Sequence, residues 1–375
     1  MTGHAGVPDL DFAEPFGYQS AMPLVPFFAY DALPGRVLFG AGTVERLGEE
    51  VDRLGGRRVL AIAGKRALDG LVERLGDRWA ASFTDVQQHV PVEAAARAVA
   101  VAADARADCL VALGGGSATG MAKAVALEHP APILAVPTTY AGSEVTPIYG
   151  LTGPEGKRTG RDLRVLPRTV IYDPALTVGL PAEVTGPSGM NALAHCVEAT
   201  YAPGANPVTS LLAEEGARLL QRGLPRAVAE PADLAARSDA LLGAYMAGAS
   251  MAAAGVGIHH QLCHLLGGAY RLPHAELHAV VLPHAVHFVA PAAQPQLARL
   301  AAGLEVEDVA GGIWDLGRRL GTPASLAELG LAETELDRAA AQAVAKVVQT
   351  PRRAGVTELR ALLEAAWQGR RPPPT

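Results

Sequence analysis

Short apolar runs alternate with stretches of helical periodicity from about residue 36 to about residue 174. Five of the runs are rich in Val, Ile and Leu and end in Gly, Pro or Thr: RVLFG, RRVLAIAG, CLVALGGG, PILAVPTT and RTVIYDP. Residues 92–107, which lie between two of them, carry Ala, Val and Glu at helical spacing. Buried strands that alternate with helices predict a largely parallel sheet covered by helices on both faces.

The pattern changes after residue 174, because the chain then becomes rich in Ala, Leu and Glu with few strand-like runs. We expect helices separated at the prolines of this part, which are Pro181, Pro207, Pro225, Pro231, Pro273, Pro283, Pro291 and Pro351. The prediction is an α/β domain over residues 22–181 followed by an all-helical domain over residues 182–375. Residues 1–21 lack periodicity and are predicted to be a flexible tail.

Composition narrows the class of protein. The 375 residues are 49% hydrophobic and 19% charged, with a net charge of −6. This balance offers no basic surface for nucleic acid or an anionic membrane. We find neither an apolar run of the roughly 18 residues that a spanning helix needs nor a secretory signal. The three cysteines have no paired spacing, which favours free core thiols in a reducing compartment. The prediction is a cytoplasmic protein with a small-molecule partner.

A glycine-rich turn joins the third of the five apolar runs to a helical stretch. Gly114, Gly115, Gly116 and Ser117 allow a ligand to approach the backbone, and the start of the following helix favours a phosphate. A second turn, PTTYAGSE, follows the next run and places Thr138 and Thr139 near the same edge of the sheet. Each turn alone is as consistent with plain turn and cap chemistry, and Lys123 in the helix with a solvated side chain.

Histidine is concentrated in one segment of the chain. Seven of the 11 histidines lie between His259 and His287. Asn191 and His195 share one face of a predicted helix, and His260 and His264 repeat the spacing on a helix that we expect to end at Gly267–Gly268. With His274 on the following loop, these side chains can converge on one cavity as ligands of Zn²⁺, Fe²⁺ or Ni²⁺, or as proton donors. The structural interpretation is favoured for His278, His284 and His287, and His259 is left open.

Taken together, GGGS with a following AK, PTT…GSE, GMNALAHCVEA and HHQLCHLLGGAYRLPHAELHAVVLPH resemble the iron-containing (group III) alcohol dehydrogenases. The resemblance implies an N-terminal dinucleotide-binding α/β domain, an all-helical catalytic domain and an active site between them. It places the cofactor pyrophosphate on Gly115, Gly116 and Ser117, with Thr138 and Thr139 also contacting the cofactor. The family's metal positions fall on Asn191, His195, His260 and His274, and its additional active-site histidine on His264.

The chain departs from the family pattern at three places. Asn191 stands where the family has an aspartate ligand, the PTTYAGSE turn is one residue shorter than usual, and Gly120 replaces a frequent aspartate. The maleylacetate reductases, a subfamily regarded as metal-independent, share these departures. Since a neutral amide is a weaker ligand than a carboxylate, no metal is expected to be required.

The resemblance to that subfamily implies reduction of the conjugated double bond of maleylacetate, or of a related enone dicarboxylate, by a homodimer. The expected cofactor is NADH, with NADPH use allowed by Lys65 and Arg66. Imidazolium groups of the histidine set are expected to stabilise charge, and Arg161, Arg271 and Arg352 are the candidates for binding the carboxylates. The alternatives are a metal-dependent alcohol dehydrogenase, a carbocyclising enzyme of the dehydroquinate-synthase-like group, and a non-catalytic binding homologue.

Overall fold

The computed structural model describes residues 28–33, 35–346 and 350–374. The chain divides into two units, residues 1–30 and residues 31–375. Of the first unit only residues 28–30 are described; they form no regular element, and Phe28 is exposed. The predicted tail over residues 1–21 lies outside the described residues. All further description concerns residues 31–375.

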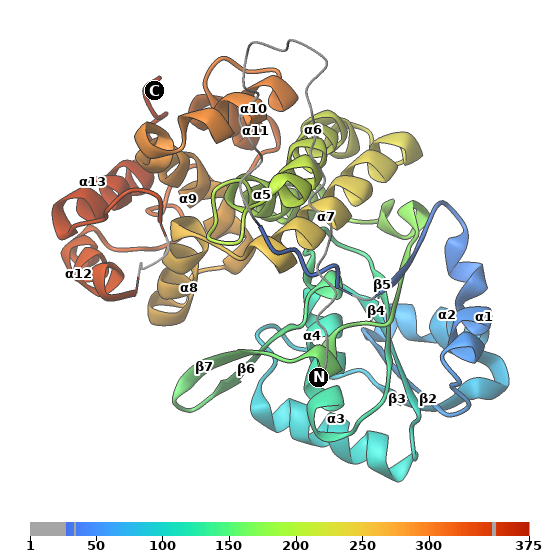
Figure 1. Ribbon diagram of the computed structural model, residues 1–375. Helices are drawn as coiled ribbons and strands as arrows, with labels where there is room; N and C mark the ends of the chain where they lie inside the picture. Colours follow the sequence, from blue (N-terminus) through green and yellow to red (C-terminus); the bar gives the residue numbers. More distant parts are fainter. Residues whose placement is uncertain (1–27, 34, 347–349, 375) are drawn as a thin grey trace, which may run out of the picture. The chain divides into compact units, whose positions relative to one another are not determined.

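A six-stranded sheet forms the first part of this unit (Figure 1). Its strands are β1 Arg36–Phe39, β2 Val59–Ala63, β3 Trp79–Phe83, β4 Cys109–Gly114, β5 Ile133–Pro137 and β8 Thr169–Tyr172. They lie in the order β1-β8-β5-β4-β2-β3, and every neighbouring pair is parallel. The five apolar runs all form strands of this sheet, as predicted. Strand β3 has no comparable run, because it lies at the sheet edge and only Phe83 in it is buried.

Alternate residues of the buried strands face two separate apolar layers. Leu60 and Ile62 of β2 pack with α3 Val92–Asp104 and α4 Gly116–Glu128. Val59, Ala61 and Ala63 pack on the other face with α1 Leu47–Arg53 and α2 Lys65–Leu75. Both faces of the sheet are therefore covered, which explains why its strands are continuously apolar. An antiparallel hairpin of β6 Ile148–Gly153 and β7 Gly156–Arg161 was not predicted.

Helices make up the second part of the unit. They are α5 Ala182–Ala199, α6 Pro207–Ala229, α7 Leu234–Ala254, α8 Ile258–Tyr270, α9 His274–Val289, α10 Gln294–Leu304, α11 Val309–Arg319, α12 Leu336–Lys346 and α13 Val356–Trp367. Short 3₁₀ helices lie at Thr43–Arg46, Gly76–Arg78, Ser143–Val145, Leu163–Val165, Pro174–Thr177, Ala290–Ala292 and Glu333–Glu335. Among the described residues after Ala182 there is no strand, so the predicted fold class is confirmed. The domain boundaries at residues 21 and 181 stay predictions.

Two of the expected helix breaks are wrong. Pro225 lies inside α6 and Pro283 inside α9. Both helices pack apolar side chains on either side of the proline, including Leu224 and Leu282, into the large core of the helical part. Packing of this kind outweighs the loss of one backbone hydrogen bond at a proline. Within the described ranges no single helix is long and apolar enough to cross a bilayer; α7 and α8, bent by 98°, pass that test only as a pair.

Candidate active site

The glycine-rich turn lies where β4 ends and α4 begins. Gly114 has a φ of 149°, which favours glycine, and Gly115 precedes the first turn of the helix. A Cβ atom on Gly115 would lie 3.0 Å from Cγ2 of Thr139, so the second turn packs directly against the first. Strand β3 lies on one side of β2, whereas β4, β5 and β8 follow one another on the other side. The chain thus changes direction across the sheet between β2 and β4, and α/β sheets bind ligands at the carboxyl ends of the strands beside such a change. The turn therefore leaves backbone N–H groups of a helix start for an anionic group.

The second turn connects the sheet to the histidines. Gly142 has a φ of 75°, and a Cβ atom there would lie 3.3 Å from Nδ1 of His195 and 3.2 Å from Cα of Gly248. Gly142 thus allows the PTTYAGSE turn to contact α5 and α7 closely. The first glycine turn therefore contacts the second, and the second contacts His195.

Lys123 holds the second turn in place. Its side chain is buried rather than solvated, which corrects the expectation from sequence. The ammonium group donates to the carbonyl oxygens of Ser143, Thr146 and Ile148 at 2.6, 2.8 and 2.7 Å. Burial lowers the pKa of Lys123 to about 7, against the opposing effect of the nearby Glu144 carboxylate. One side chain of α4 therefore fixes the path of residues 143–148.

The predicted site side chains gather into one cluster. The His195 ring of α5 stacks on the His260 ring of α8 with centroids 4.8 Å apart. The His264 ring lies 6.2 Å from that of His260 and 6.0 Å from that of His274. Asn191 lies one turn before His195 on α5. Two local expectations were wrong: α8 continues past Gly267–Gly268 to Tyr270, and His274 is the first residue of α9 rather than part of a loop.

Glu198, which the sequence reasoning missed, orients His260. This fully buried carboxylate accepts Nδ1–H of His260 at 2.6 Å. It also accepts the backbone N–H groups of Gly257 and His259 at 2.8 and 2.7 Å, so it caps the start of α8. Since Nδ1 is committed to Glu198, His260 takes or gives a proton through Nε2. The signal was available, because Glu198 follows His195 by three residues and lies on a neighbouring position of the same helix.

Three buried polar atoms of the cluster have no hydrogen-bond partner among the described residues: Oδ1 of Asn191, Nδ1 of His195 and Nε2 of His260. Unsatisfied buried polar atoms are costly, so their presence together indicates a place for a polar ligand. Burial lowers the pKa of His195 well below its usual value, and the nearby His260 acts in the same direction. The imidazolium form that was expected at His195 is therefore disfavoured. His264 is exposed to solvent.

The residues at the family's metal positions do not fit a tightly held iron. Asn191 supplies a neutral amide, and the buried Glu198 carboxylate already accepts two backbone N–H groups and Nδ1–H of His260. Nε2 of His274 lies 3.3 Å from Nε2 of His278, at hydrogen-bonding distance. The four residues at the metal positions thus include no anionic ligand, and Nε2 of His274 already contacts another side chain.

The arginines suggested for the carboxylates are mostly engaged elsewhere. Arg352 donates to the Phe288 carbonyl and stacks on the Phe288 ring, at the far end of α9 and roughly 20 Å along the helix from His274. Its suggested role is therefore wrong. Arg161 donates to the Ala252 carbonyl at 3.1 Å, and Arg271 is exposed after α8. A cavity of about 380 Å³ beside Arg352 is lined by none of the ten residues predicted for the catalytic and cofactor sites.

Two family models match the chain: "Iron-containing alcohol dehydrogenase" over residues 34–174 and "Fe-containing alcohol dehydrogenase family, C-terminal" over residues 185–367. The chain belongs to the iron-containing alcohol dehydrogenase family, and it is an oxidoreductase of this NAD(H)-using family. The family's description names iron, so it gives no support to the expectation that a metal is not required.

The similar proteins include maleylacetate reductases. The chain is 48% identical to that of Burkholderia cepacia, over 92% of this chain and 99% of the relative. The crystal structure of maleylacetate reductase from Rhizobium sp. strain MTP-10005 matches with a TM-score of 0.89 and 46% identity, over 92% of this chain and 99% of that one. That of the enzyme from Agrobacterium tumefaciens matches with a TM-score of 0.89 and 44% identity, over 92% and 100%.

Proposed function

We propose that the chain reduces the conjugated double bond of maleylacetate, or of a closely related enone dicarboxylate, with NAD(P)H, as a step in the degradation of aromatic compounds. The product from maleylacetate is 3-oxoadipate. The observation that carries this proposal is the near full-length similarity to maleylacetate reductases. A histidine cluster in contact with a dinucleotide-type glycine turn supports it.

The cofactor is proposed to be NADH, with NADPH also accepted. Its pyrophosphate binds Gly115, Gly116 and Ser117 at the start of α4, and Thr138 and Thr139 line the adjoining turn. Strand β2 is followed by Gly64 rather than by an acidic residue that would bind a ribose hydroxyl and repel a 2′-phosphate. Lys65 and Arg66, exposed at the start of α2, can accommodate that phosphate.

In the proposed reaction, negative charge develops on the ketone oxygen of the substrate, beside the imidazoles of the cluster. Hydride passes from the nicotinamide to the alkene carbon β to the ketone, and the alkene electron pair moves through the α carbon to the ketone oxygen as an enolate. The α carbon then takes a proton as the ketone reforms. Imidazole N–H dipoles from His195 and His274 stabilise the enolate, and His260, oriented by Glu198, donates the proton through Nε2. The exposed His264 exchanges protons with solvent, and Asn191 orients the polar ligand.

We also propose that a metal ion is not required. The support is the donor set itself, in which an amide replaces a carboxylate and His274 already contacts His278. The chain is further proposed to act as a cytoplasmic homodimer. It is also proposed to have no nucleic-acid or membrane partners, and its net charge of −6 supports this last point.

The test is NADH oxidation with maleylacetate, run on metal-stripped enzyme and on enzyme supplemented with Fe²⁺ or Zn²⁺. The proposal expects similar rates in both and little activity with simple aldehydes. A rate that chelation abolishes and metal restores, with aldehydes as the better substrates, favours the metal-dependent alcohol dehydrogenase instead. No NADH oxidation with any dicarboxylic enone contradicts the proposal and leaves the non-catalytic homologue.

A further inference from the structure

His89, a histidine of the α/β part that was not among the predicted site residues, adjoins the active-site cluster. It lies in the segment between β3 and α3, and its side chain is exposed. Its ring centroid is 6.4 Å from that of His274, and the two rings are nearly perpendicular at 81°. Since His274 is the first residue of α9, a side chain of the α/β part meets the histidines of the helical part here.

The backbone at His89 has a conformation that residues other than glycine rarely adopt. His89 has a φ of 62° and the following Val90 a φ of 48°, so both lie in the left-handed region. The conformation is especially unfavourable for a β-branched residue such as Val90. Backbone strain of this kind persists only where surrounding contacts impose it, and it is found preferentially at catalytic and ligand-binding sites.

Contacts from two elements impose this conformation. Oγ1 of Thr152 in β6 donates to the His89 carbonyl at 2.8 Å, and the Thr152 N–H donates to the Val90 carbonyl at 3.0 Å. The Val90 side chain is buried in the apolar layer that α3 and α4 cover. It packs beside Gly120 of α4, where a Cβ atom would lie 2.9 Å from Cγ2 of Val90. The β6–β7 hairpin and α4 therefore hold His89 at its place beside His274.

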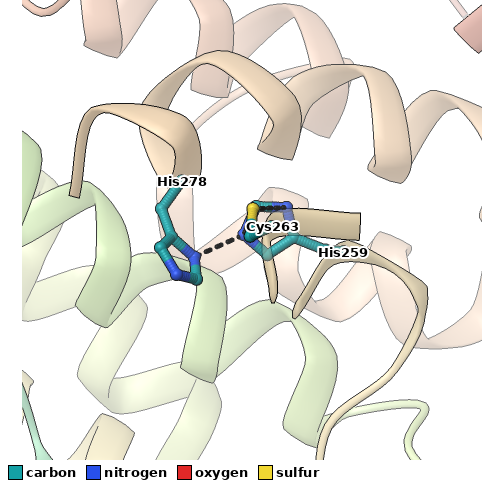
Figure 2. A group of neighbouring side chains, drawn as sticks. All are labelled: His259, Cys263 and His278. Carbon is teal, nitrogen blue, oxygen red and sulfur yellow. Dashed lines mark hydrogen bonds between the residues drawn. The ribbon is translucent and has the colours of Figure 1, made fainter. Parts of the chain in front are cut away.

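His274 also contacts buried side chains of the helical part. Its Nε2 lies 3.3 Å from Nε2 of His278, and Nδ1 of His278 lies 2.7 Å from Nε2 of His259. Figure 2 shows His259, His278 and Cys263, all fully buried, between α8 and α9. A substrate cannot reach His274 through these side chains. It reaches the partly buried His274 from solvent, where the exposed ring of His89 is a neighbour.

The place of His89 suits the second functional group of the proposed substrate. In the proposed reaction His274 lies beside the ketone oxygen, and a single methylene group separates the ketone carbon of maleylacetate from the carboxylate of its acetate arm. A donor whose ring is 6.4 Å from that of His274 can reach this carboxylate. An imidazole carries at least one N–H whether or not it is charged, so the contact requires no particular protonation state of His89.

We propose that His89 is a substrate-binding residue that donates a hydrogen bond to the carboxylate of the acetate arm of maleylacetate. The inference rests on the proposed function, because it concerns the orientation of that substrate. With its ketone oxygen at His274 and this carboxylate at His89, the substrate contacts both parts of the chain. His89 thereby favours an enone with two carboxylates over one that lacks the acetate-arm carboxylate.

His89→Gly removes the ring and keeps the backbone, since glycine readily adopts a φ of 62°. Gln88→Gly, a change at the preceding exposed residue, is the matched control. For His89→Gly we expect KM for maleylacetate to rise about tenfold, with kcat within about threefold of the control's and KM for NADH unchanged. For cis-4-oxopent-2-enoate, in which a methyl group replaces the acetate arm, KM should be the same in both variants.

A binding measurement without reaction separates this inference from the proposed function. 3-Oxoadipate has the acetate-arm carboxylate, 4-oxopentanoate lacks it, and neither has an alkene to reduce. Calorimetric titration in the presence of NAD⁺ should show that His89→Gly binds 3-oxoadipate about tenfold more weakly than Gln88→Gly does, and 4-oxopentanoate equally well. Equal binding of 3-oxoadipate by both variants, or an equal loss for both ligands, overturns the inference. The expected binding pattern in an enzyme that oxidises no NADH with maleylacetate overturns only the proposed function.

Discussion

Asn191 decides the metal chemistry of the cluster, because every other side chain at the family's metal positions is an imidazole. We expect Asn191→Asp to bind a divalent cation at least about tenfold more tightly, since a carboxylate adds an anionic ligand beside His195. The measurement is metal content by mass spectrometry after dialysis against Zn²⁺ and then a weak chelator. Asn206→Asp is the matched control, because it adds one carboxylate at a helix N-cap, where aspartate can accept the same two backbone N–H groups. Equal metal content in both variants contradicts the account.

His264 is the exposed histidine of the cluster, and its removal should interrupt proton exchange with solvent. His264→Ala is expected to lower kcat for NADH oxidation with maleylacetate by more than about tenfold, with a smaller change in KM. His287→Ala is the control, since His287 lies toward the far end of α9 and lines the separate cavity. An unchanged kcat in His264→Ala would remove this residue from the mechanism.

At the residue scale, the sequence could identify the members of the cluster but not the contacts behind them. Spacing on a helix brought Asn191 with His195, and His260 with His264. Glu198 and Lys123 were not recognised, because a charged residue in a sequence is usually solvated and its burial depends on partners from distant segments. The bond between His259 and His278 joins two helices, so no local pattern reports it.

At the scale of elements, α4 fixes the path of the second turn through the side chain of Lys123. Lys123→Met leaves three carbonyl groups, that of Thr146 buried, without their donor and is expected to lower the free energy of unfolding by about 3 kcal/mol. Because the turn adjoins the glycine-rich loop, KM for NADH should rise several-fold. Chemical denaturation and steady-state kinetics measure the two effects. Lys346→Met, at an exposed position on α12, is the control. If Lys123→Met had the same KM for NADH as Lys346→Met, Lys123 would have no role in shaping the cofactor site.

The elements that the sequence predicted well are those whose pattern is local. Four of the five apolar runs became the almost wholly buried strands β2, β4, β5 and β8. The fifth became β1, an edge strand in which only Leu38 is buried. Strand β3 and the β6–β7 hairpin lack such runs, and their pairing depends on neighbouring segments. The helix ends predicted at Pro225 and Pro283 were wrong, because tertiary packing keeps α6 and α9 continuous.

At the scale of the whole molecule, stability depends on histidines that are buried in the neutral form. Burial lowers the pKa of His284 to about 4 from 6.5, and the nearby His287 and Arg370 act in the same direction. Between these values the unfolded chain binds a proton that the folded chain does not, so stability falls as the pH drops from about 6.5 toward 4. The loss per histidine is at most about 1.4 kcal/mol per pH unit.

His284→Gln removes this titration and should therefore lose less stability between pH 6.5 and pH 5 than the parent enzyme does. Thermal or urea unfolding followed across this range measures the difference. His129→Gln, which changes a histidine that is only partly buried, is the control. A pH dependence identical to the parent's in His284→Gln would contradict the burial argument.

We propose that this site delivers hydride to a carbon–carbon double bond and not to a carbonyl carbon. The direct measurement uses NADH that carries deuterium at the transferable position of the nicotinamide, with maleylacetate as the substrate and metal-stripped enzyme. We expect deuterium at the former alkene carbon β to the ketone, in a product that keeps the ketone. Deuterium on a carbon that bears a new hydroxyl group would contradict it.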